Sequence, residues 1–528
     1  MAADKNIKKY ILAVDHGTSG VKTSLVSIYG EVLDTETKKT PITFLPGGGA
    51  EQDPGLWWEA LIQTSQKVVA KKLVAVDDIV AVCVSSTFSS TVAVDEQGNH
   101  LGNSLTWMDS RGATYIRELV GGFPSFEGYN ILKVLPSIYK TGGGPQLSGK
   151  DDIAHVLWWK NTAPEVYKKT HMFLGSKDYL NLKLTGKFAA SFDSVMLFWV
   201  TNTRDINNIY YDDWIIKMMG IDKAKLPPLK RSIDVLGNIL PQVAERIGVS
   251  REVKVVCGSP DHQSACIGSG AVRDFEGHFY VGTSSWIQCI VPFKKTDIFH
   301  SIASLPTAIP GKYYCVNEQD IAAGCLSFLV DNILFRKNLL NASGPPGDVY
   351  QKMDEVAANV PPGSNKLIFT PWLNGERTPV DSTTVRAGIY NMSMTTTSDE
   401  IIRAFMEGVA YNSRWMLMYV EKFIGRKMEH LNIVGGGGKS KVWCQIFGDV
   451  MDREIRQVKD PMQANARGAA FIASVGLGCI KFEDIPDLVK IENVFKPDPD
   501  NRKIYDELFA EFLQIYKNNR KMFKRLNK

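Results

Sequence analysis

The sequence lacks the two commonest nucleotide-binding signatures. Its 528 residues contain neither a G-x-x-x-x-G-K-[S/T] loop nor a complete G-x-G-x-x-G fingerprint. A P-loop and a Rossmann dinucleotide site are therefore not predicted. If the protein uses a nucleotide, another kind of turn must hold its phosphates.

Cysteine, histidine and long apolar runs are also scarce. The eight cysteines form no C-x-x-C pair, and the eight histidines do not group with them. Reduced, mostly buried thiols are therefore favoured over disulfides, and no zinc site is predicted. The apolar run near the start extends only from Tyr10 to Val14 before Asp15 interrupts it, which is too short for a signal peptide or a membrane span. We expect a cytoplasmic enzyme.

The charge of the chain is nearly balanced. It has 61 Lys and Arg against 57 Asp and Glu, a formal net charge of +4, with the basic residues spread along the chain. Only 517–528 gathers them, six among apolar residues, and we interpret this segment as the solvated face of a terminal helix rather than a membrane or RNA patch. No nucleic-acid or membrane partner is expected. The length predicts two domains.

A repeated pattern is the most informative feature present. Residues 10–20 read Y-I-L-A-V-D-H-G-T-S-G, and F-Y-V-G-T-S-S follows at 279–285, about half of the chain later. Glycine lets a backbone approach closely, while Thr and Ser supply hydroxyl and N–H donors to anionic oxygens. Two ordinary hairpin turns would give the same letters. The half-chain spacing favours one phosphate-binding architecture used twice.

The order of expected elements indicates an α/β fold. Asp53 and Pro54 predict a helix start, with Asp53 as the N-cap. In the second half, a strand runs into four consecutive glycines, where a helix N-terminus would favour phosphate. The expected strands are 10–14, 22–28, 79–85, 91–94, 253–257, 431–434 and 454–458, and the expected helices of the second half are 439–451 and 465–475.

Taken together, the motifs resemble those of one family, the FGGY carbohydrate kinases. Eight segments occur in the family's order: D-H-G-T-S-G (15–20), E-Q-D-P-x-x-W-W (51–58), T-W-M-D-S-R (106–111), G-S-K-D-Y-L-x-x-K-L-T-G (175–186), S-P-D-H-Q-S-A (259–265), V-G-T-S (281–284), N-G-E-R-T-P (374–379) and G-G-G-G-K-S-x-x-W-C-Q-I-F-G-D (435–449). The spacing is most similar to the xylulokinase branch.

This resemblance implies an architecture and an activity. The fold would be the two-domain actin and hexokinase-like (ribonuclease H-like) ATPase fold, with duplicated α/β domains around a deep cleft. Residues 1–272 would form the sugar-binding domain and 273–528 the nucleotide-binding domain. The chain would transfer the γ-phosphoryl group of ATP, with Mg²⁺, to a hydroxyl of a small sugar or polyol. A homodimer is the assembly that the family suggests.

The resemblance also assigns roles to residues. Asp261 would be the catalytic base, although an aspartate beside a proline is often only a turn residue or cap. Asp15 would organise Mg²⁺, and Lys22 is either a phosphate neighbour or a solvated strand residue. The phosphates of ATP would contact Gly17, Thr18, Ser19, Gly282, Thr283, Gly436, Gly437 and Gly438.

Sugar-binding residues are expected in two segments. Trp107, Asp109 and Arg111 would border the pocket, with Arg111 alternatively a structural ion-pair residue. Xylulokinases place G-Q-M-H-G after the strand that corresponds to 79–85, whereas this chain has S-S-T-F-S-S at 85–90. Ser86, Thr87 and Phe88 are therefore candidate specificity residues, or else a plain turn.

The substrate expectation follows from this departure. Xylulose is favoured by the overall resemblance, and ribulose, gluconate or another polyol remains an alternative. A non-catalytic, actin-like or sensing protein is the other alternative. Two histidines stay unassigned at this point: His262 beside the proposed base is interpreted as a polar wall residue, and His16 replaces the apolar residue usual in the first motif.

Overall fold

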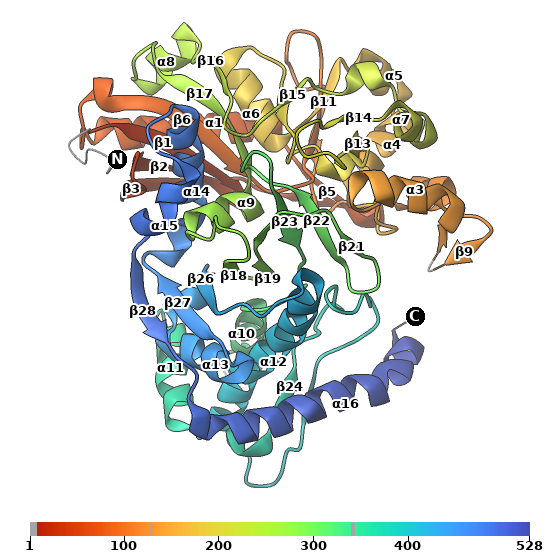
Figure 1. The fold of residues 1–528 in the computed structure, drawn as a ribbon, viewed down its shortest axis with the longest axis vertical. Coiled ribbons are helices and arrows are strands. Elements are labelled where there is room, and N and C mark those ends of the chain that lie inside the picture. Colours follow the sequence, from red (N-terminus) through yellow and green to blue (C-terminus); the bar gives the residue numbers. More distant parts are fainter. Residues whose placement is uncertain (1–7, 127, 339–343, 528) are drawn as a thin grey trace.

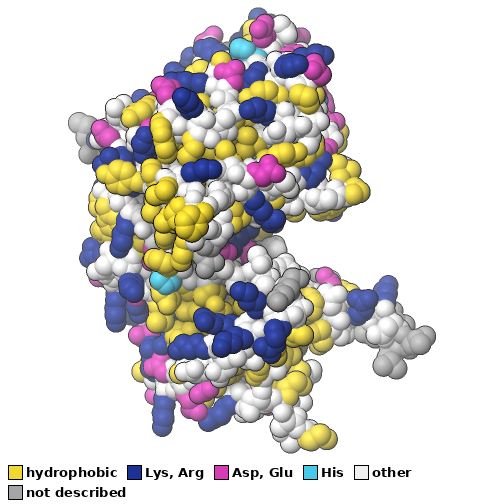
Figure 2. Space-filling model, turned by 90° about the vertical axis from the view of Figure 1, so that its right-hand side faces the viewer, with side chains coloured by type: hydrophobic (Ala, Val, Ile, Leu, Met, Phe, Trp, Pro, Cys, Tyr) yellow, Lys and Arg dark blue, Asp and Glu magenta, His cyan; other side chains and the backbone are white. Residues whose placement is uncertain are grey.

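The chain forms two lobes, one above the other, each built around a twisted sheet with helices packed against it (Figure 1). The computed structural model describes residues 8–126, 128–338 and 344–527. We call the part around the first sheet the first lobe and the part around the second sheet the second lobe. In the space-filling view a notch separates the two (Figure 2).

The sheet of the first lobe has the order β16-β17-β6-β1-β2-β3. Strands β1 and β2 form an antiparallel hairpin, and β6 and β17 continue the sheet parallel to β1. The central strands are buried on both faces, which explains their continuous apolar runs. Their bounds are Tyr10–Gly17 (β1), Gly20–Ser27 (β2), Val32–Lys39 (β3), Ile79–Ser86 (β6), Val235–Asn238 (β16) and Lys254–Pro260 (β17).

The sheet of the second lobe repeats this plan. Its order is β19-β18-β26-β27-β28, in which the hairpin β18/β19 is followed by β26 and β27 parallel to β18. Each sheet thus begins with a hairpin whose turn is Gly-Thr-Ser, so the duplication expected from the sequence is confirmed. The bounds are Gly277–Val281 (β18), Ser285–Gln288 (β19), His430–Val434 (β26), Glu454–Val458 (β27) and Ile491–Phe495 (β28).

Smaller sheets complete the two lobes. The first lobe also carries β11-β7-β8-β5-β4, and a sheet of order β20-β23-β22-β21 extends from the second lobe towards the first (Figure 1). Their bounds are Thr43–Leu45 (β4), Gly49–Gln52 (β5), Thr91–Val94 (β7), Ser104–Leu105 (β8), Met172–Gly175 (β11), Ile290–Val291 (β20), Thr296–Asp297 (β21), Ile302–Pro306 (β22) and Tyr313–Val316 (β23). Two-stranded pairs join β9 (Ser125–Phe126) to β10 (Tyr129–Asn130), β12 (Ala190–Ser191) to β15 (Leu229–Lys230), β13 (Thr201–Asn202) to β14 (Tyr210–Tyr211), and β24 (Ile368–Thr370) to β25 (Gly388–Tyr390).

Helices cover both sheets. Helix α1 begins where expected, with the Asp53 carboxylate accepting a hydrogen bond from the Gly55 N–H at 2.7 Å. The bounds are Pro54–Ala70 (α1), Ala113–Val120 (α2), Ile131–Thr141 (α3), Asp152–Thr162 (α4), Pro164–Lys169 (α5), Ser176–Thr185 (α6), Asp213–Met219 (α7), Pro241–Ile247 (α8), Asp261–Gly268 (α9), Gly324–Phe328 (α10), Val349–Asn359 (α11), Ser398–Ile424 (α12), Lys441–Met451 (α13), Ala464–Gly476 (α14), Ile485–Leu488 (α15) and Arg502–Leu526 (α16).

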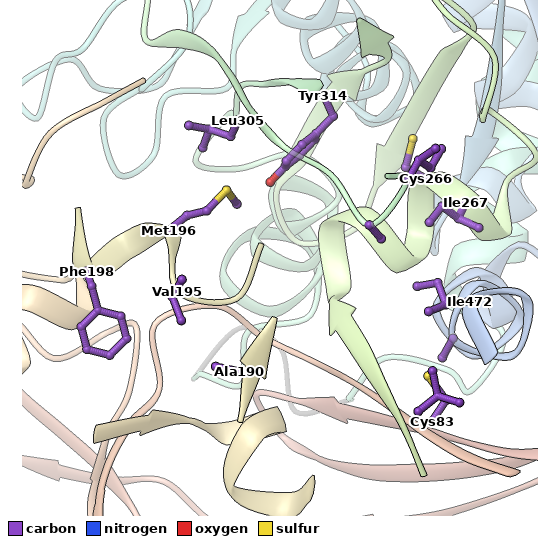
Figure 3. Packing of buried hydrophobic residues seen from close by; sticks show 14 of the residues in the cluster. Cys83, Ala190, Val195, Met196, Phe198, Cys266, Ile267, Leu305, Tyr314 and Ile472 are labelled. Carbon is purple, nitrogen blue, oxygen red and sulfur yellow. The ribbon is translucent and has the colours of Figure 1, made fainter. Parts of the chain in front are cut away.

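One helix of the second half belongs structurally to the first sheet. Helix α14 packs against α9 and against β1, β6 and β17. Figure 3 shows Ile472 of α14 beside Ile267 of α9, with Cys83 of β6 below them. The domain boundary at 272/273 stays a prediction. The apolar core of the first lobe includes residues from both sides of it, because α14 packs against the first sheet.

The crossing of α9 and α14 is unusually close. A Cβ atom added at Gly468 would lie 1.8 Å from the Ser264 carbonyl oxygen, and one added at Gly268 would lie 1.8 Å from the Ala464 oxygen. Only glycine fits at these two positions, because the two backbones leave no room for a Cβ atom. The glycines therefore set the distance between the helix that begins at Asp261 and the helix that begins at Ala464.

The chain ends in the long helix α16, which lies along the base of the second lobe (Figure 1). Its buried face is aromatic and aliphatic: Tyr505, Leu508, Phe509, Phe512 and Phe523. The basic residues of 517–525 are exposed, so the expected solvated face is confirmed for them, while Lys528 lies outside the described residues. None of the helices in the described ranges combines the length and apolar character that a membrane crossing requires.

Candidate active site

Three parallel strands of the first sheet end at the same edge and bring the expected residues together. In the register, Asp15 of β1 pairs with Ser85 of β6, and Pro260 of β17 pairs with Ser86. Asp261 follows Pro260 directly as the first residue of α9. Carboxyl ends of parallel strands are the usual ligand-binding edge of α/β sheets. Asp15 and Asp261, 246 positions apart in the chain, thus lie close together because the strand order β17-β6-β1 places their strands side by side.

Asp261 is half-buried at this edge. Its Oδ1 accepts a hydrogen bond from the His262 N–H at 2.9 Å. Burial, and then the negative charge of Asp15, raise the pKa of Asp261 to about 8. A carboxyl group with this pKa is mostly protonated at pH 7, and once it is ionised its high proton affinity favours proton uptake from a hydroxyl, as a general base requires.

Asp15 is held by residues from both halves of the chain. It is 6% exposed, and its carboxylate accepts hydrogen bonds from the Lys22 Nζ at 3.3 Å and from the Asn465 amide at 3.4 Å. Lys22 is therefore an ion-pair partner of Asp15 rather than a free strand residue. Asn465 lies at the start of α14, and sequence reasoning missed it because it is 450 positions away and belongs to no phosphate motif.

The first Gly-Thr-Ser turn is held by hydrogen bonds from the first lobe and is partly exposed to solvent. The Trp107 indole N–H donates to the Thr18 hydroxyl at 3.0 Å, and the Gln52 amide donates to the Thr18 carbonyl oxygen at 3.0 Å. Gly17 is half-buried, whereas Ser19 is exposed. Backbone and hydroxyl donors of this turn are consequently accessible to a ligand, while its shape is set by the first lobe.

The second turn and the four-glycine turn are in contact. A Cβ added at Gly282 would lie 2.5 Å from the Tyr280 ring, and the carbonyl oxygen of Thr283 accepts a hydrogen bond from the Ala322 N–H at 2.7 Å. Gly437 packs so tightly on Val281 that an added Cβ would lie 2.4 Å from that side chain. Both predicted phosphate segments of the second lobe thus form one surface.

The remaining glycines of this turn differ in their surroundings. Gly435 has a φ of +89°, which favours glycine. An added Cβ at Gly436 would meet only the Met462 sulfur at 3.9 Å, whereas Gly438 packs on Pro461. The backbone at Gly436 is thus open for close approach by a ligand.

The segment 106–111 is locked by an ion-pair network. Asp109 is fully buried, and its carboxylate accepts the Ala50 N–H at 2.9 Å and the Arg111 Nε at 2.9 Å. Arg111 also donates to Glu51 at 2.6 Å and stacks over the Trp158 ring at 4.2 Å. This matches the structural alternative for Arg111, and the network holds the loop that presents Trp107.

An aromatic series links the loop after β6 to the second lobe. Phe88 contacts the His262 ring edge-on, with centroids 5.6 Å apart. His262 stacks on Trp286 at 3.9 Å, and Trp286 stacks on Tyr280 at 4.0 Å. Burial lowers the pKa of His262 to about 3, so its ring is neutral. The interpretation of His262 as a wall residue is consistent with this packing.

The residues preceding Phe88 follow the sheet edge. The Thr87 N–H donates to the His16 carbonyl oxygen at 3.0 Å, and Ser86 is nearly buried. The His16 side chain points into the first lobe, where its ring lies 4.5 Å from that of Trp57. Burial lowers the pKa of His16 to about 3. His16 is thus a neutral packing residue next to the phosphate turn.

A charged group in the second lobe faces the same space, and sequence reasoning did not assign it. Arg377, in the N-G-E-R-T-P segment, pairs with Glu318 and with Asp320, the latter at 2.7 Å. Glu318 helps to raise the pKa of Asp261, and Arg377, Asp320 and Glu318 all influence that of Lys150. The motif was visible in the sequence, but its partners lie about sixty positions away.

The carboxylates fit Mg²⁺ without forming a complete cage. Among the described residues, no three His, Cys, Asp or Glu side chains gather as a metal site. Mg²⁺ is usually held by one or two carboxylates together with water and substrate phosphates. The Asp15 carboxylate, beside Asp261 and the first phosphate turn, would offer oxygen ligands of that kind.

These features are those expected of a sugar kinase, and comparison with known proteins gives the family. The model of the FGGY family of carbohydrate kinases, N-terminal domain, matches residues 10–268, and that of the C-terminal domain matches residues 279–477. The chain belongs to the FGGY family of carbohydrate kinases. It is a phosphotransferase with an alcohol group as acceptor, and enzymes of this family take the phosphoryl group from ATP.

Similar proteins act on more than one sugar. The chain is 25% identical over 524 residues to the xylulose kinase of Staphylococcus epidermidis, covering 98% of each chain. It is 24% identical over 507 residues to the gluconokinase of Bacillus subtilis, covering 96% of this chain and 95% of that one. The ligand-bound xylulose kinase structure from Lactobacillus acidophilus superposes with a TM-score of 0.85 at 24% identity, covering 98% of this chain and all of that one. This confirms the two-lobed fold expected from the sequence.

Proposed function

We propose that this kinase phosphorylates a ketopentose such as xylulose, using Mg·ATP, with Asp261 as the catalytic base. The observation that carries the proposal is the half-buried position of Asp261 beside Asp15, directly after β17. The similarity to xylulose kinases over nearly the whole chain supports the substrate class.

The proposed reaction needs one proton transfer. The sugar hydroxyl oxygen attacks the γ-phosphorus of ATP, its proton passes to the Asp261 carboxylate, and the bond to the bridging oxygen breaks to release ADP. Mg²⁺, held through Asp15, would neutralise phosphate charge. Gly17, Thr18 and Ser19 would contact the γ-phosphate from the first lobe.

The second lobe would bind the rest of the nucleotide. Gly282 and Thr283 lie at the end of β18, in contact with the four-glycine turn. Close approach of backbone N–H groups suits phosphates and the nucleotide body. Closure of the two lobes would then exclude water, which prevents hydrolysis of ATP without sugar.

In the sugar pocket, aromatic faces and donors would work together. Trp107 and Phe88 would cover C–H surfaces, and Ser86 and Thr87 would offer hydroxyl and backbone groups. We propose that Asp109 and Arg111 act mainly by holding the Trp107 loop, since they bind each other and Glu51. A substrate hydroxyl at Arg111 would use the donors that this pairing leaves open.

Gluconate is the second candidate, favoured by the similarity to a gluconokinase. Arg377 is already paired with Glu318 and Asp320, so a sugar carboxylate would depend on Lys150. The Lys150 carbonyl oxygen accepts the Ser89 hydroxyl at 2.6 Å, which places this lysine next to the Phe88 loop. Lys150→Met therefore separates the candidates: it should abolish turnover of gluconate and leave turnover of a neutral ketose nearly unchanged.

The test is a substrate panel. Purified protein is incubated with Mg·ATP and each of xylulose, ribulose, gluconate, ribitol and glycerol, while ADP release and sugar-phosphate mass are followed together. Phosphorylated xylulose that disappears in Asp261→Asn supports the proposal. ADP release without any sugar phosphate would contradict it and favour an actin-like or sensing role.

Two further statements belong to the same proposal. We place the protein in the cytoplasm, which the eight free cysteines support because reduced thiols persist in reducing compartments. We also propose a homodimer, on the family resemblance alone. Sedimentation at several protein concentrations tests the dimer, and a single monomeric species would contradict it.

A further inference from the structure

A second pocket lies outside the proposed active site, where the two lobes meet. Helix α3 of the first lobe and strand β21 of the second lobe lie side by side there (Figure 1). The Thr296 hydroxyl donates to the Gly142 carbonyl oxygen at 2.7 Å, which ties the two elements together. The pocket has a volume of about 550 Å³, and it is lined by Leu135, Ile138, Tyr139, Arg204, Lys294, Lys295, Thr296 and Ile298.

Its charged lining is entirely positive. Arg204, Lys294 and Lys295 line the pocket, and no acidic residue does. The Lys294 ammonium donates to the Lys140 carbonyl oxygen at 3.0 Å and to the Thr203 hydroxyl, but forms no ion pair among the described residues. Burial, and then Arg204, lower the pKa of Lys294 to about 7, as is typical of a cation without a counter-charge.

The acids nearest in sequence are engaged elsewhere. Asp297 pairs with His300 at 2.8 Å, and the Asp205 carboxylate accepts the Asn207 N–H at 3.0 Å. Neither acid lines the pocket, whose ionisable residues besides Tyr139 are Arg204, Lys294 and Lys295. Anions bind at such places, because the cations are already positioned.

The other walls are apolar and accessible. Tyr139 is 60% exposed, Leu135 is 51% exposed and Ile298 is 44% exposed. Arg204 stacks on the Tyr139 ring at 4.0 Å, which leaves the edge of its guanidinium free to donate. Figure 2 shows this side of the molecule, where hydrophobic side chains and Lys and Arg side chains alternate. Surfaces of this mixed kind select ligands that are both apolar and charged.

We propose that this pocket binds a small organic phosphate with an apolar or aromatic body, the phosphate on Arg204 and Lys294 and the body against Leu135 and Ile138. The ligand would bridge the lobes, because Arg204 belongs to the first lobe and Lys294 to the second, while its apolar contacts come from α3 of the first lobe. The site shares no residue with the proposed active site, so it does not depend on which sugar is phosphorylated.

Isothermal titration with three probes tests the ligand class. Phenyl phosphate, inorganic phosphate and phenol are titrated separately into the full-length protein saturated with Mg²⁺ and a non-hydrolysable ATP analogue, which occupies the nucleotide site. We expect phenyl phosphate to bind at least tenfold more tightly than either fragment. Equal affinities for phenyl phosphate and inorganic phosphate, or no binding of phenyl phosphate, would overturn the proposal.

Variants test the location. Arg204→Gln and Lys294→Met should each weaken phenyl phosphate binding about tenfold, since each removes a charge-assisted hydrogen bond. Arg231→Gln is the control, because Arg231 is exposed and pairs with Asp234 elsewhere. Arg204 is itself exposed, so its variant keeps the fold even if Lys294→Met does not, and a thermal melt verifies this. Unchanged affinity in Arg204→Gln would reject the site.

Discussion

At the scale of single residues, two carboxylates dominate the proposed active site. Asp261→Asn removes the base with almost no change in volume, and loss of a general base commonly costs about 10²- to 10⁴-fold in rate. We expect kcat on the true substrate to fall by that factor while nucleotide affinity stays within a few-fold. Steady-state kinetics and nucleotide titration check this, and undiminished turnover would exclude Asp261 as the base.

The raised pKa of Asp261 makes a second prediction. The Asp261 carboxyl group has a pKa of about 8 in the folded state and 3.8 in the unfolded state. Its contribution to the free energy of unfolding is therefore fully present below about pH 4 and is lost as the pH rises to about 8. Ligand-free Asp261→Asn should therefore melt at a higher temperature than the wild type at pH 9. The difference in melting temperature between the two proteins should be smaller at pH 5. Calorimetry at both values measures it. The control is Asp77→Asn at an exposed position, and the same gap at both pH values would contradict the pKa.

Lys22 gives a test of how Asp15 is held. Lys22→Met removes the ion pair at 3.3 Å, so the Mg²⁺ concentration needed for half-maximal activity should rise several-fold because Asp15 loses a partner that orients it. The melting temperature should also fall, since the buried Asp15 carboxylate loses one of its hydrogen bonds. Lys71→Met is a matched control: Lys71 is similarly exposed and pairs with Asp34 and Glu36, away from Asp15. Equal magnesium dependence of both variants would show that Lys22 does not act through Asp15.

At the scale of elements, the glycine contact between α9 and α14 is the most demanding. Gly468→Ala would force the helices apart, and overpacking of this kind typically costs about 1–3 kcal/mol. We expect a lower midpoint in denaturant unfolding and a loss of activity, since α9 begins at Asp261 and α14 carries Asn465. Gly347→Ala is the control, because open space surrounds that residue. Two identical midpoints would refute the close packing.

The elements themselves were largely predictable from the sequence. Strand 454–458 was predicted with the bounds that the structure has, and α1 begins at the expected Asp53 cap. Helix α13 begins two residues later than predicted, since Gly437–Lys439 forms a separate tight turn and Ser440 caps the helix at Trp443. Local propensity and capping decide such features, so a single sequence reveals them.

Contacts between distant segments were not predictable in the same way. The phosphate turns and Asp261 follow from motifs, whereas Asn465 at Asp15 and the acids around Arg377 depend on how strands and lobes are arranged. Likewise, the sequence leaves two readings of Arg111, and only the fold brings Glu51 within 2.6 Å of it. The experiments described above decide the roles proposed for these residues.

At the scale of the whole molecule, one buried carboxylate joins the terminal helix to the second lobe. Glu407 of α12 is fully buried and accepts hydrogen bonds from Arg403 and Ser364 at 2.8 Å, and from Tyr505 and the Gly363 N–H at 2.9 Å. Removing one partner of a buried ion pair costs about 3–5 kcal/mol. Glu407→Ala should therefore lower the free energy of unfolding by that order.

Urea unfolding followed by circular dichroism measures this loss. Glu492→Ala, at an exposed position of β28, is the control and should change the free energy of unfolding by less than about 0.5 kcal/mol. A Glu407→Ala variant as stable as this control would show that α16 is held by its apolar face alone.

The buried thiols of the folded chain can report how often its core opens. Seven of the eight cysteines are buried, and burial raises the pKa of the Cys83 and Cys444 thiols, which makes them poor nucleophiles. Only Cys479 is partly accessible. Alkylation by a small reagent should thus modify Cys479 first, and every later event marks an opening of the core, so mass spectrometry of the labelled protein reads out the rate at which each lobe opens.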